Sequence, residues 1–99
     1  MTPIKPSTHP GIILKEEFAI PLGLTQAKIS KDLHIGIKTI SEIYNEKRGI
    51  SSIMALKLSE YFKTTPQFWL NLQNAYDLHK AYEKEKENLK TIIQCEVAA

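Results

Sequence analysis

Five aliphatic side chains within one short stretch constrain the fold of this chain more than any other feature of its sequence. Ile29 and Leu33 are four residues apart and share one face of a helix, as do Ile40 and Ile43, which are three apart. Ile35 lies between the two pairs, in a connection that is long enough only for a tight turn. The pattern therefore predicts two brief helices that pack together through these side chains.

Prolines, glycines and capping residues divide the chain into further helices. One helix should start at Pro10, capped by Thr8 or His9, because proline is tolerated in a first helical turn. It should end near Gly23, because glycine readily adopts the left-handed conformation that ends helices. No segment shows the sustained alternation of apolar and polar residues that a strand requires. The chain is therefore predicted to be all-α, with five helices at about 10–23, 26–33, 37–45, 53–62 and 66–94.

The last two helices carry more apolar residues than one helical face needs. In the fourth helix, capped by Ser51 or Ser52, the predicted apolar surface is formed by Ile53, Leu56, Leu58, Tyr61 and Phe62. In the front half of the fifth helix it is formed by Phe68, Trp69, Leu70, Leu72, Ala75, Tyr76 and Leu78. These aromatic residues are mainly expected in the core, with part of the surface left for a dimer or partner contact. The rear half, "EKEKENLK", interleaves opposite charges and is expected to project or fray.

Length and composition favour one domain that covers residues 1–99. A chain of 99 residues that is 42% apolar buries enough surface for one core and no more. Residues 1–8 are predicted to be a flexible arm, because the first ten residues contain three prolines. No apolar run approaches the roughly 18 residues of a membrane helix, and no signal peptide is evident, so we expect a cytoplasmic protein with no membrane partner. The single cysteine, Cys95, excludes an internal disulfide and is expected to be an exposed thiol.

Residues capable of catalysis or metal binding are present, but their spacing does not suit either role. The three histidines, His9, His34 and His79, are too scattered to form a metal site. Glu16 and Glu17 are adjacent, so on a helix they point in different directions and do not form a carboxylate pair. There is also no glycine-rich phosphate loop. We therefore expect no enzymatic activity, no metal and no cofactor, with a hydrolytic enzyme and a structural interaction module as the alternatives.

Two short helices joined by a three- or four-residue turn form a helix-turn-helix, whose second helix enters the major groove of DNA. We assign this motif to residues 25–45, with an ordinary helical hairpin as the alternative interpretation. Outward residues in the second helix are the candidates for reading bases: Ile37, Lys38, Thr39 and Glu42. Polar residues at the edges of the motif are the candidates for phosphate contacts: Thr25, Gln26, Asn45, Lys47 and Arg48.

The charge distribution is compatible with this assignment. Residues 25–48 contain five basic and three acidic residues, so they carry the whole net charge of +2. A net charge this small does not by itself drive tight binding to a polyanion, and a solvated charged face is the alternative interpretation. Lys38 could donate to guanine, and Thr39 and Ile37 could contact a thymine methyl group. Glu42 could accept from cytosine but would repel nearby phosphates, so the predicted set of base contacts is sparse.

Several longer motifs extend the pattern beyond the two short helices. They are "HPGIILKEEFAIPLGLTQ" upstream, "TIS" and "KRGIS" around the third and fourth helices, and "PQFWLNLQNAYDL" at the start of the fifth. Over residues 9–79 these motifs resemble the XRE-type helix-turn-helix antitoxins of the HigA group, also called VapI-like antidote proteins. The resemblance implies an all-α, five-helix, phage-repressor-like helix-turn-helix domain with a long C-terminal helix.

The resemblance also implies a function. Proteins of this group are antitoxins of type II toxin-antitoxin modules that bind palindromic operator DNA as dimers and repress their own operons. They neutralise a HigB-like toxin, which is a RelE-like mRNA endonuclease. The alternative is a stand-alone XRE-type transcriptional repressor without a toxin partner, for which the same DNA-binding residues would serve.

Three positions depart from what is usual in the family. His34 replaces a turn glycine, and if a positive φ is required there, histidine is one of the few other residues enriched at such angles. Gly36 replaces a serine cap, which costs only a few tenths of a kcal/mol. Ile37 replaces a residue that is commonly polar. This last change affects the details of base readout rather than the fold.

Overall fold

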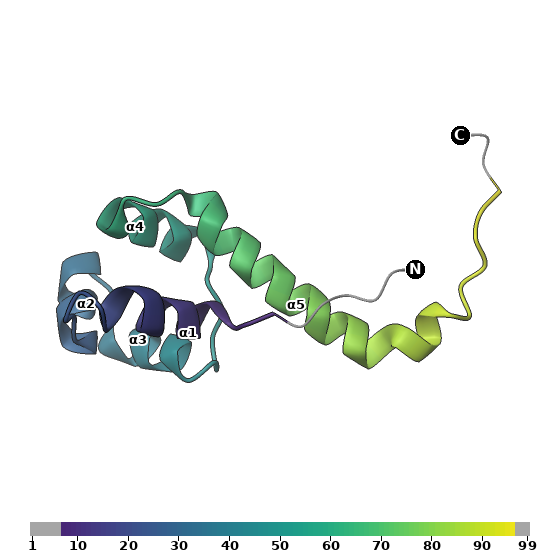
Figure 1. Ribbon diagram of the computed structural model, residues 1–99, viewed down its shortest axis with the longest axis horizontal. Helices are drawn as coiled ribbons and strands as arrows, with labels where there is room; N and C mark the ends of the chain where they lie inside the picture. Colours follow the sequence, from purple (N-terminus) through teal and green to yellow (C-terminus); the bar gives the residue numbers. More distant parts are fainter. Residues whose placement is uncertain (1–6, 97–99) are drawn as a thin grey trace.

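The computed structural model describes residues 7–96, and over that range its regular structure is entirely helical (Figure 1). The elements are α1 (Pro10–Ile13), η1 (Leu14–Ala19), α2 (Gln26–Leu33), α3 (Ile37–Tyr44), α4 (Ser52–Phe62) and α5 (Pro66–Leu89). Since η1 continues α1 without a break, the chain forms five helical segments, and the predicted all-α fold is confirmed. Residues 1–6 of the predicted arm lie outside the described residues.

The first helical segment changes its hydrogen-bonding pattern along its length. It begins at Pro10 with His9 as its cap, and the Nδ1 atom of His9 accepts a hydrogen bond from the Gly11 amide at 2.8 Å. After one turn it widens into the π-helix η1, in which the Ile20 amide donates to the Lys15 carbonyl at 2.9 Å. The following turn reaches Gly23 at a φ of 67°. The predicted start of this segment is therefore confirmed, but its helical structure ends at Ala19, four residues before the predicted end at Gly23.

Hydroxyl caps start three of the remaining helices. Thr25 accepts from the Lys28 amide at 3.1 Å at the start of α2, and Ser51 accepts from the Met54 amide at 3.1 Å at the start of α4. Thr65 accepts from the Phe68 amide at 3.2 Å and is followed by Pro66, the first residue of α5. Each cap satisfies a backbone donor that the helix itself leaves free. Of the two caps predicted for the fourth helix, Ser51 and Ser52, the structure has Ser51.

The core is formed by one cluster of apolar side chains drawn from every helical segment. Its fully buried members are Leu14, Ala19, Ile29, Leu33, Ile40, Ile43, Ile50, Met54, Ala55, Leu58 and Trp69. Four of the five aliphatic residues that predicted the helix-turn-helix belong to it, and the fifth, Ile35, packs against it while half-buried. The indole Nε1 of Trp69 donates to Thr64 Oγ1 at 2.8 Å, so this polar group is also satisfied. Burial of these side chains is the main stabilising term for the fold.

The predicted apolar surfaces of the last two helices are only partly buried. In α4, Ile53 and Leu56 are 68% and 56% exposed, and the helix turns Met54, Ala55, Leu58 and Ser59 inward instead. Apolar residues occupy nearly the whole circumference of this helix, so their spacing does not determine which side is buried. In α5, Trp69 is the only buried residue, and Leu78 is 56% exposed.

The C-terminal helix also ends earlier than predicted, at Leu89 rather than at residue 94. Figure 1 shows α5 starting among the other helices and then running away from them, so its rear half has no neighbouring helix. Without a packing partner, its helical structure depends on local pairs such as Lys86 with Glu83 at 3.1 Å and Lys90 with Glu87 at 3.3 Å. Such pairs are weak, and the helix ends soon after them.

Candidate nucleic-acid interface

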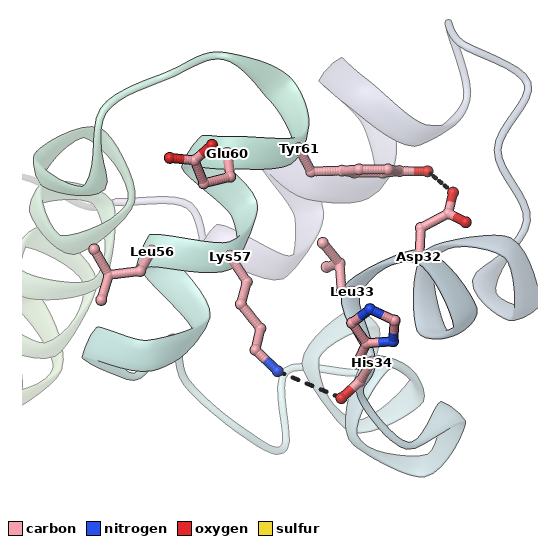
Figure 2. Close-up of a pocket in the computed structure, with 7 residues that line it drawn as sticks. All are labelled: Asp32, Leu33, His34, Leu56, Lys57, Glu60 and Tyr61. Carbon is pink, nitrogen blue, oxygen red and sulfur yellow. Dashed lines mark hydrogen bonds between the residues drawn. The ribbon is translucent and has the colours of Figure 1, made fainter.

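The turn between α2 and α3 has the conformation predicted for it. His34 has a φ of 56° and a ψ of 49°, in the left-handed region, so the expected positive φ is confirmed. The Ser30 hydroxyl, on α2, donates a hydrogen bond to the Ile35 carbonyl in the turn. Lys57, on α4, donates from its Nζ to the His34 carbonyl at 3.4 Å (Figure 2). The turn that precedes the candidate reading helix is therefore held from two sides.

The start of α3 is open to solvent. Gly36 is its cap residue and makes no side-chain capping bond, and a Cβ placed there would meet nothing within 4 Å. Ile37 is 53% exposed, Lys38 is exposed and Thr39 is half-buried, while Ile40 behind them is fully buried. Residues 37–44 form a regular helix. The side chains predicted to read bases at this end are therefore accessible, on a helix that the core holds in place.

The end of α3 and the following loop bring together two residues to which the sequence analysis gave different roles. Arg48 donates to Glu42 Oε1 from Nη2 at 3.0 Å and from Nε at 3.2 Å, which makes a two-point ion pair. Asn45 Nδ2 lies 3.5 Å from Ser41 Oγ, and Lys47 is exposed. The predicted base-reading carboxylate and the predicted phosphate-binding guanidinium therefore bind each other.

The start of α2 holds the remaining predicted phosphate contacts. Thr25 is exposed while its hydroxyl oxygen caps the helix, and Gln26 is half-exposed. Further along α2, Lys28 forms an ion pair with Asp32 at 3.1 Å. Arg48 also has a carboxylate partner. Of the five basic residues in the segment 25–48, three form no ion pair with any of residues 7–96: Lys31, Lys38 and Lys47.

An open hollow lies beside the turn, between α2 and α4. It has a volume of about 410 Å³ and is lined by Asp32, Leu33, His34, Leu56, Lys57, Glu60 and Tyr61. Figure 2 shows Tyr61 reaching across from α4 to Asp32, whose Oδ2 accepts from the phenol at 2.5 Å. This hydrogen bond, with a smaller contribution from Lys28, lowers the pKa of Asp32, and it raises the pKa of Tyr61 to about 12. The pair ties α4 to the first helix of the motif.

Sequence reasoning missed the contacts that hold the far end of α3. A Cβ on Gly11 would lie 1.9 Å from the Ile43 carbonyl oxygen, so the first turn of α1 packs directly on the α3 backbone. His9 is buried, its ring lies 4.8 Å from the Tyr76 ring on α5, and burial lowers the pKa of its imidazole. The available signal was "HPG", a glycine in a first helical turn where no turn conformation needs one.

Two other kinds of feature, metal-binding clusters and membrane-spanning helices, are absent from the described part of the chain. Residues 7–96 contain no group of three or more potential metal ligands placed to hold one ion. Cys95 is free and exposed, as predicted. Among the same residues, no helix has both the length and the apolar composition needed to cross a membrane. The exposed helix-turn-helix is therefore the candidate site that the geometry offers.

Known proteins share this architecture. A helix-turn-helix domain family matches residues 20–77. Virulence-associated protein I of Dichelobacter nodosus is 46% identical over 88 residues, which cover 89% of this chain and 81% of that protein. The solved structure of Pseudomonas aeruginosa antitoxin HigA with the higBA promoter has a TM-score of 0.85 and 37% identity, covering 91% of this chain and 98% of that one.

A second solved structure, the antitoxin GraA in complex with its operator, has a TM-score of 0.88 and 39% identity. The match covers 99% of this chain and 98% of that one, so it includes the long C-terminal helix as well as the helix-turn-helix. Both solved structures are of antitoxins, one with promoter DNA and the other with operator DNA. The chain therefore belongs to the family of helix-turn-helix DNA-binding antitoxins and transcriptional regulators that includes HigA.

Proposed function

We propose that this protein is the antitoxin of a type II toxin-antitoxin module, and that it represses its own operon by binding operator DNA. The observation that carries the proposal is the start of α3, where Ile37 and Lys38 are exposed in front of the buried Ile40. Recognition helices place this end in the major groove. The likeness of the whole chain to antitoxins solved with promoter or operator DNA supports the same orientation.

The proposed base contacts come from the exposed side of α3. Lys38 donates to guanine O6 and N7, Thr39 bonds a base edge, and Ile37 packs against a thymine methyl group. Glu42 acts together with its partner Arg48, because their ion pair must open or shift before either reaches a base or a phosphate. The set is small, so specificity per half-site is modest.

The proposed phosphate contacts come from both edges of the motif. At one edge, Thr25 and Gln26 lie at the positive end of the α2 dipole, which favours an anion. At the other edge, Asn45, Lys47 and Arg48 are exposed on the segment that follows α3. Contacts at both edges would fix the helix in the groove without reading sequence.

We further propose that the protein acts as a homodimer whose contact includes the exposed face of α4. Ile53 and Leu56 are exposed there, and Figure 2 shows Leu56 pointing away from α2. In a two-fold pairing of antiparallel α4 helices, Leu56 of one copy packs against Leu56 of the other at the centre of the contact.

The dimer proposal is tested by molar mass. Leu56→Asp places charges in the centre of the contact and should give a monomer at micromolar concentration, while Glu16→Asp, on exposed η1, should leave the dimer intact. A dimeric Leu56→Asp variant, or a monomeric wild type, would overturn it. A dimer also predicts operator half-sites about 34 Å, or a multiple of that distance, apart.

The proposal also includes a toxin as the protein partner. Its support is the likeness to a HigA solved with the higBA promoter, and we infer a HigB-like, RelE-like mRNA endonuclease as the partner. A stand-alone repressor is the second candidate, because every proposed DNA contact lies on residues 25–48 of this chain and needs no toxin. The two candidates are distinguished by the neighbouring gene. A short, basic open reading frame next to this one, whose product co-purifies with this protein, would support the antitoxin over the stand-alone repressor.

Binding to DNA from the upstream region tests the shared part of both candidates. Mobility shifts at several salt concentrations, on that DNA and on random DNA of the same length, should show tighter binding to the upstream fragment. Because phosphate neutralisation releases counterions, affinity for both should fall steeply with salt. Equal affinity for the two DNAs, or no salt dependence, would reject operator recognition.

A further inference from the structure

The loop after α3 is bound to α5 by the side chain of Gln73, which lies far from the loop in sequence. Gln73 Oε1 accepts a hydrogen bond from the Ile50 amide at 2.7 Å, across 23 residues of sequence. Gln73 Nε2 in turn donates to Asp77 Oδ1 at 2.9 Å, one helical turn further along α5. The glutamine therefore uses both ends of its amide, and its orientation is fixed by two different partners.

The loop backbone is shaped to receive this side chain. A Cβ on Gly49 would lie 2.8 Å from the Gln73 side-chain amide, closer than side chains approach one another. A larger residue at this position would have to push the Gln73 amide away from the loop. Ile50, the next residue, is buried, so without Gln73 its amide would have no water molecule to donate to. The position of the Gln73 amide thus depends on the glycine at position 49, and the Ile50 amide depends on Gln73 for its hydrogen bond.

A second contact holds the start of this loop near the same face of α5. His9, the cap of α1, packs its ring on the Tyr76 ring at a centroid distance of 4.8 Å, and Gly11 in the same helical turn packs on the Ile43 carbonyl at the end of α3. Tyr76 follows Gln73 by three residues, which places both on one side of the helix. Between Ile43, which α1 holds, and Ile50, which Gln73 holds, Glu46 has a φ of 60°, a conformation that costs energy for a residue with a side chain. The path of residues 45–50 is therefore imposed by contacts outside the loop.

The geometry points to Gln73 as a positioning residue for DNA binding: it holds the loop that carries Lys47 and Arg48 in the conformation that meets phosphates. The inference rests on the proposed DNA-binding function and deepens it, because Gln73 itself lies on α5 and not on the helix-turn-helix. It couples the long helix to the DNA surface through the Ile50 amide. A change at this end of α5 would therefore alter phosphate contacts without any direct contact between α5 and DNA.

The first experiment compares variants of the pair that Gln73 forms with Asp77. Gln73→Ala removes the acceptor, so affinity for operator and random DNA should fall together by roughly three- to tenfold, and the salt slope should fall by about 0.9 for each phosphate that the loop no longer neutralises. Gln73→Glu combined with Asp77→Asn exchanges the charges of the two residues and keeps both hydrogen bonds. This double variant should bind as the wild type does. Asn74→Ala, on the neighbouring exposed position, is the matched control.

The second experiment uses Gly49. Gly49→Ala should weaken DNA binding in the wild type, because the new methyl group displaces the Gln73 amide, but it should add nothing in the Gln73→Ala background. Additive effects of the two substitutions would overturn the inference, since a general loss of stability adds whereas removal of one shared hydrogen bond does not. Wild-type affinity and salt slope in Gln73→Ala would overturn it as well.

Hydrogen exchange of the Ile50 amide separates this inference from the proposed function. In the absence of DNA, Gln73→Ala should accelerate exchange at Ile50 far more than at Leu58 in the core, while the double exchange variant restores protection. If the wild type binds no DNA but exchange behaves in this way, the proposed function fails and the contact stands. If exchange at Ile50 does not change, Gln73 does not hold the loop and the inference fails.

Discussion

The first residues of α3 have open space around them, whereas its last turn is covered by the backbone of another helix. At the start, a Cβ on Gly36 would meet nothing within 4 Å, and no side chain caps the helix. At the end, a Cβ on Gly11 would overlap the Ile43 carbonyl oxygen at 1.9 Å. The following loop is fastened to α5 through Gln73. One helix of eight residues thus has a free end and a fixed end.

The difference between these ends suits a helix that reads DNA. Side chains at the free end can adjust to base edges because Ile37 and Lys38 are exposed to solvent. The fixed end sets the direction of the helix, since α1 and α5 both hold it. We therefore expect substitutions at the fixed end to affect mainly stability and overall DNA affinity, and substitutions at the free end to affect mainly specificity.

The largest effect is expected for Gly11→Ala. The methyl group cannot fit against the Ile43 carbonyl, so α1 must shift away from α3. Overpacking of this kind typically costs about 1–3 kcal/mol, and more where backbone must move. Urea unfolding monitored by circular dichroism should show a lower midpoint with an unchanged slope. An unfolding free energy equal to that of the wild type would show that the fixed end is not close-packed.

The contrast between the two ends of α3 also explains which features of the structure could be predicted from the sequence. The two helices of the motif follow from residues at most four positions apart, and sequence spacing determines such relations directly. The positive φ of His34 was expected from the resemblance, because the family usually has glycine at that position. The fixed end depends on contacts between residues far apart, such as Gly11 with Ile43 and Gln73 with Ile50. Spacing along the chain does not encode those.

For a related reason, the sequence does not determine which part of each apolar surface is buried. In α4 an apolar run surrounds the helix, so Ile53 and Leu56 fit the core pattern as well as Met54 and Leu58 do. The choice depends on which side the other helices cover. The Glu42–Arg48 pair was missed because both side chains are long and exposed, and their partner is selected by the path of the loop. Local propensity does not specify that path.

At the free end, Lys38→Ala should weaken operator binding by about 1–3 kcal/mol and relax the preference for operator over random DNA. The reason is that the substitution removes a hydrogen bond to a base together with a positive charge. Lys84→Ala, in the rear half of α5, removes the same charge from an exposed position and is the matched control. Mobility shifts on both DNAs measure the effect. Equal losses on operator and random DNA would show that Lys38 contacts phosphates only.

At the fixed end, Arg48→Ala should weaken binding to all sequences alike and lower the salt slope by about one. Because Arg48 pairs with Glu42, the substitution also leaves a carboxylate without its partner near the DNA. Repeating it in the Glu42→Gln background separates the two effects. A slope that stays constant in that background would show that Arg48 neutralises Glu42 and binds no phosphate itself.

The smallest effect is expected for Gly36→Ser. The backbone of Gly36 has a φ of −59°, which serine adopts without strain, and the surrounding space is empty. A serine hydroxyl can cap α3 by accepting from a first-turn amide, which should add about 0.3 kcal/mol to the free energy of unfolding. Urea unfolding, with Gly11→Ala measured alongside, gives the comparison. A loss instead of a gain would mean that the start of α3 is not free, and the contrast between its two ends would no longer hold.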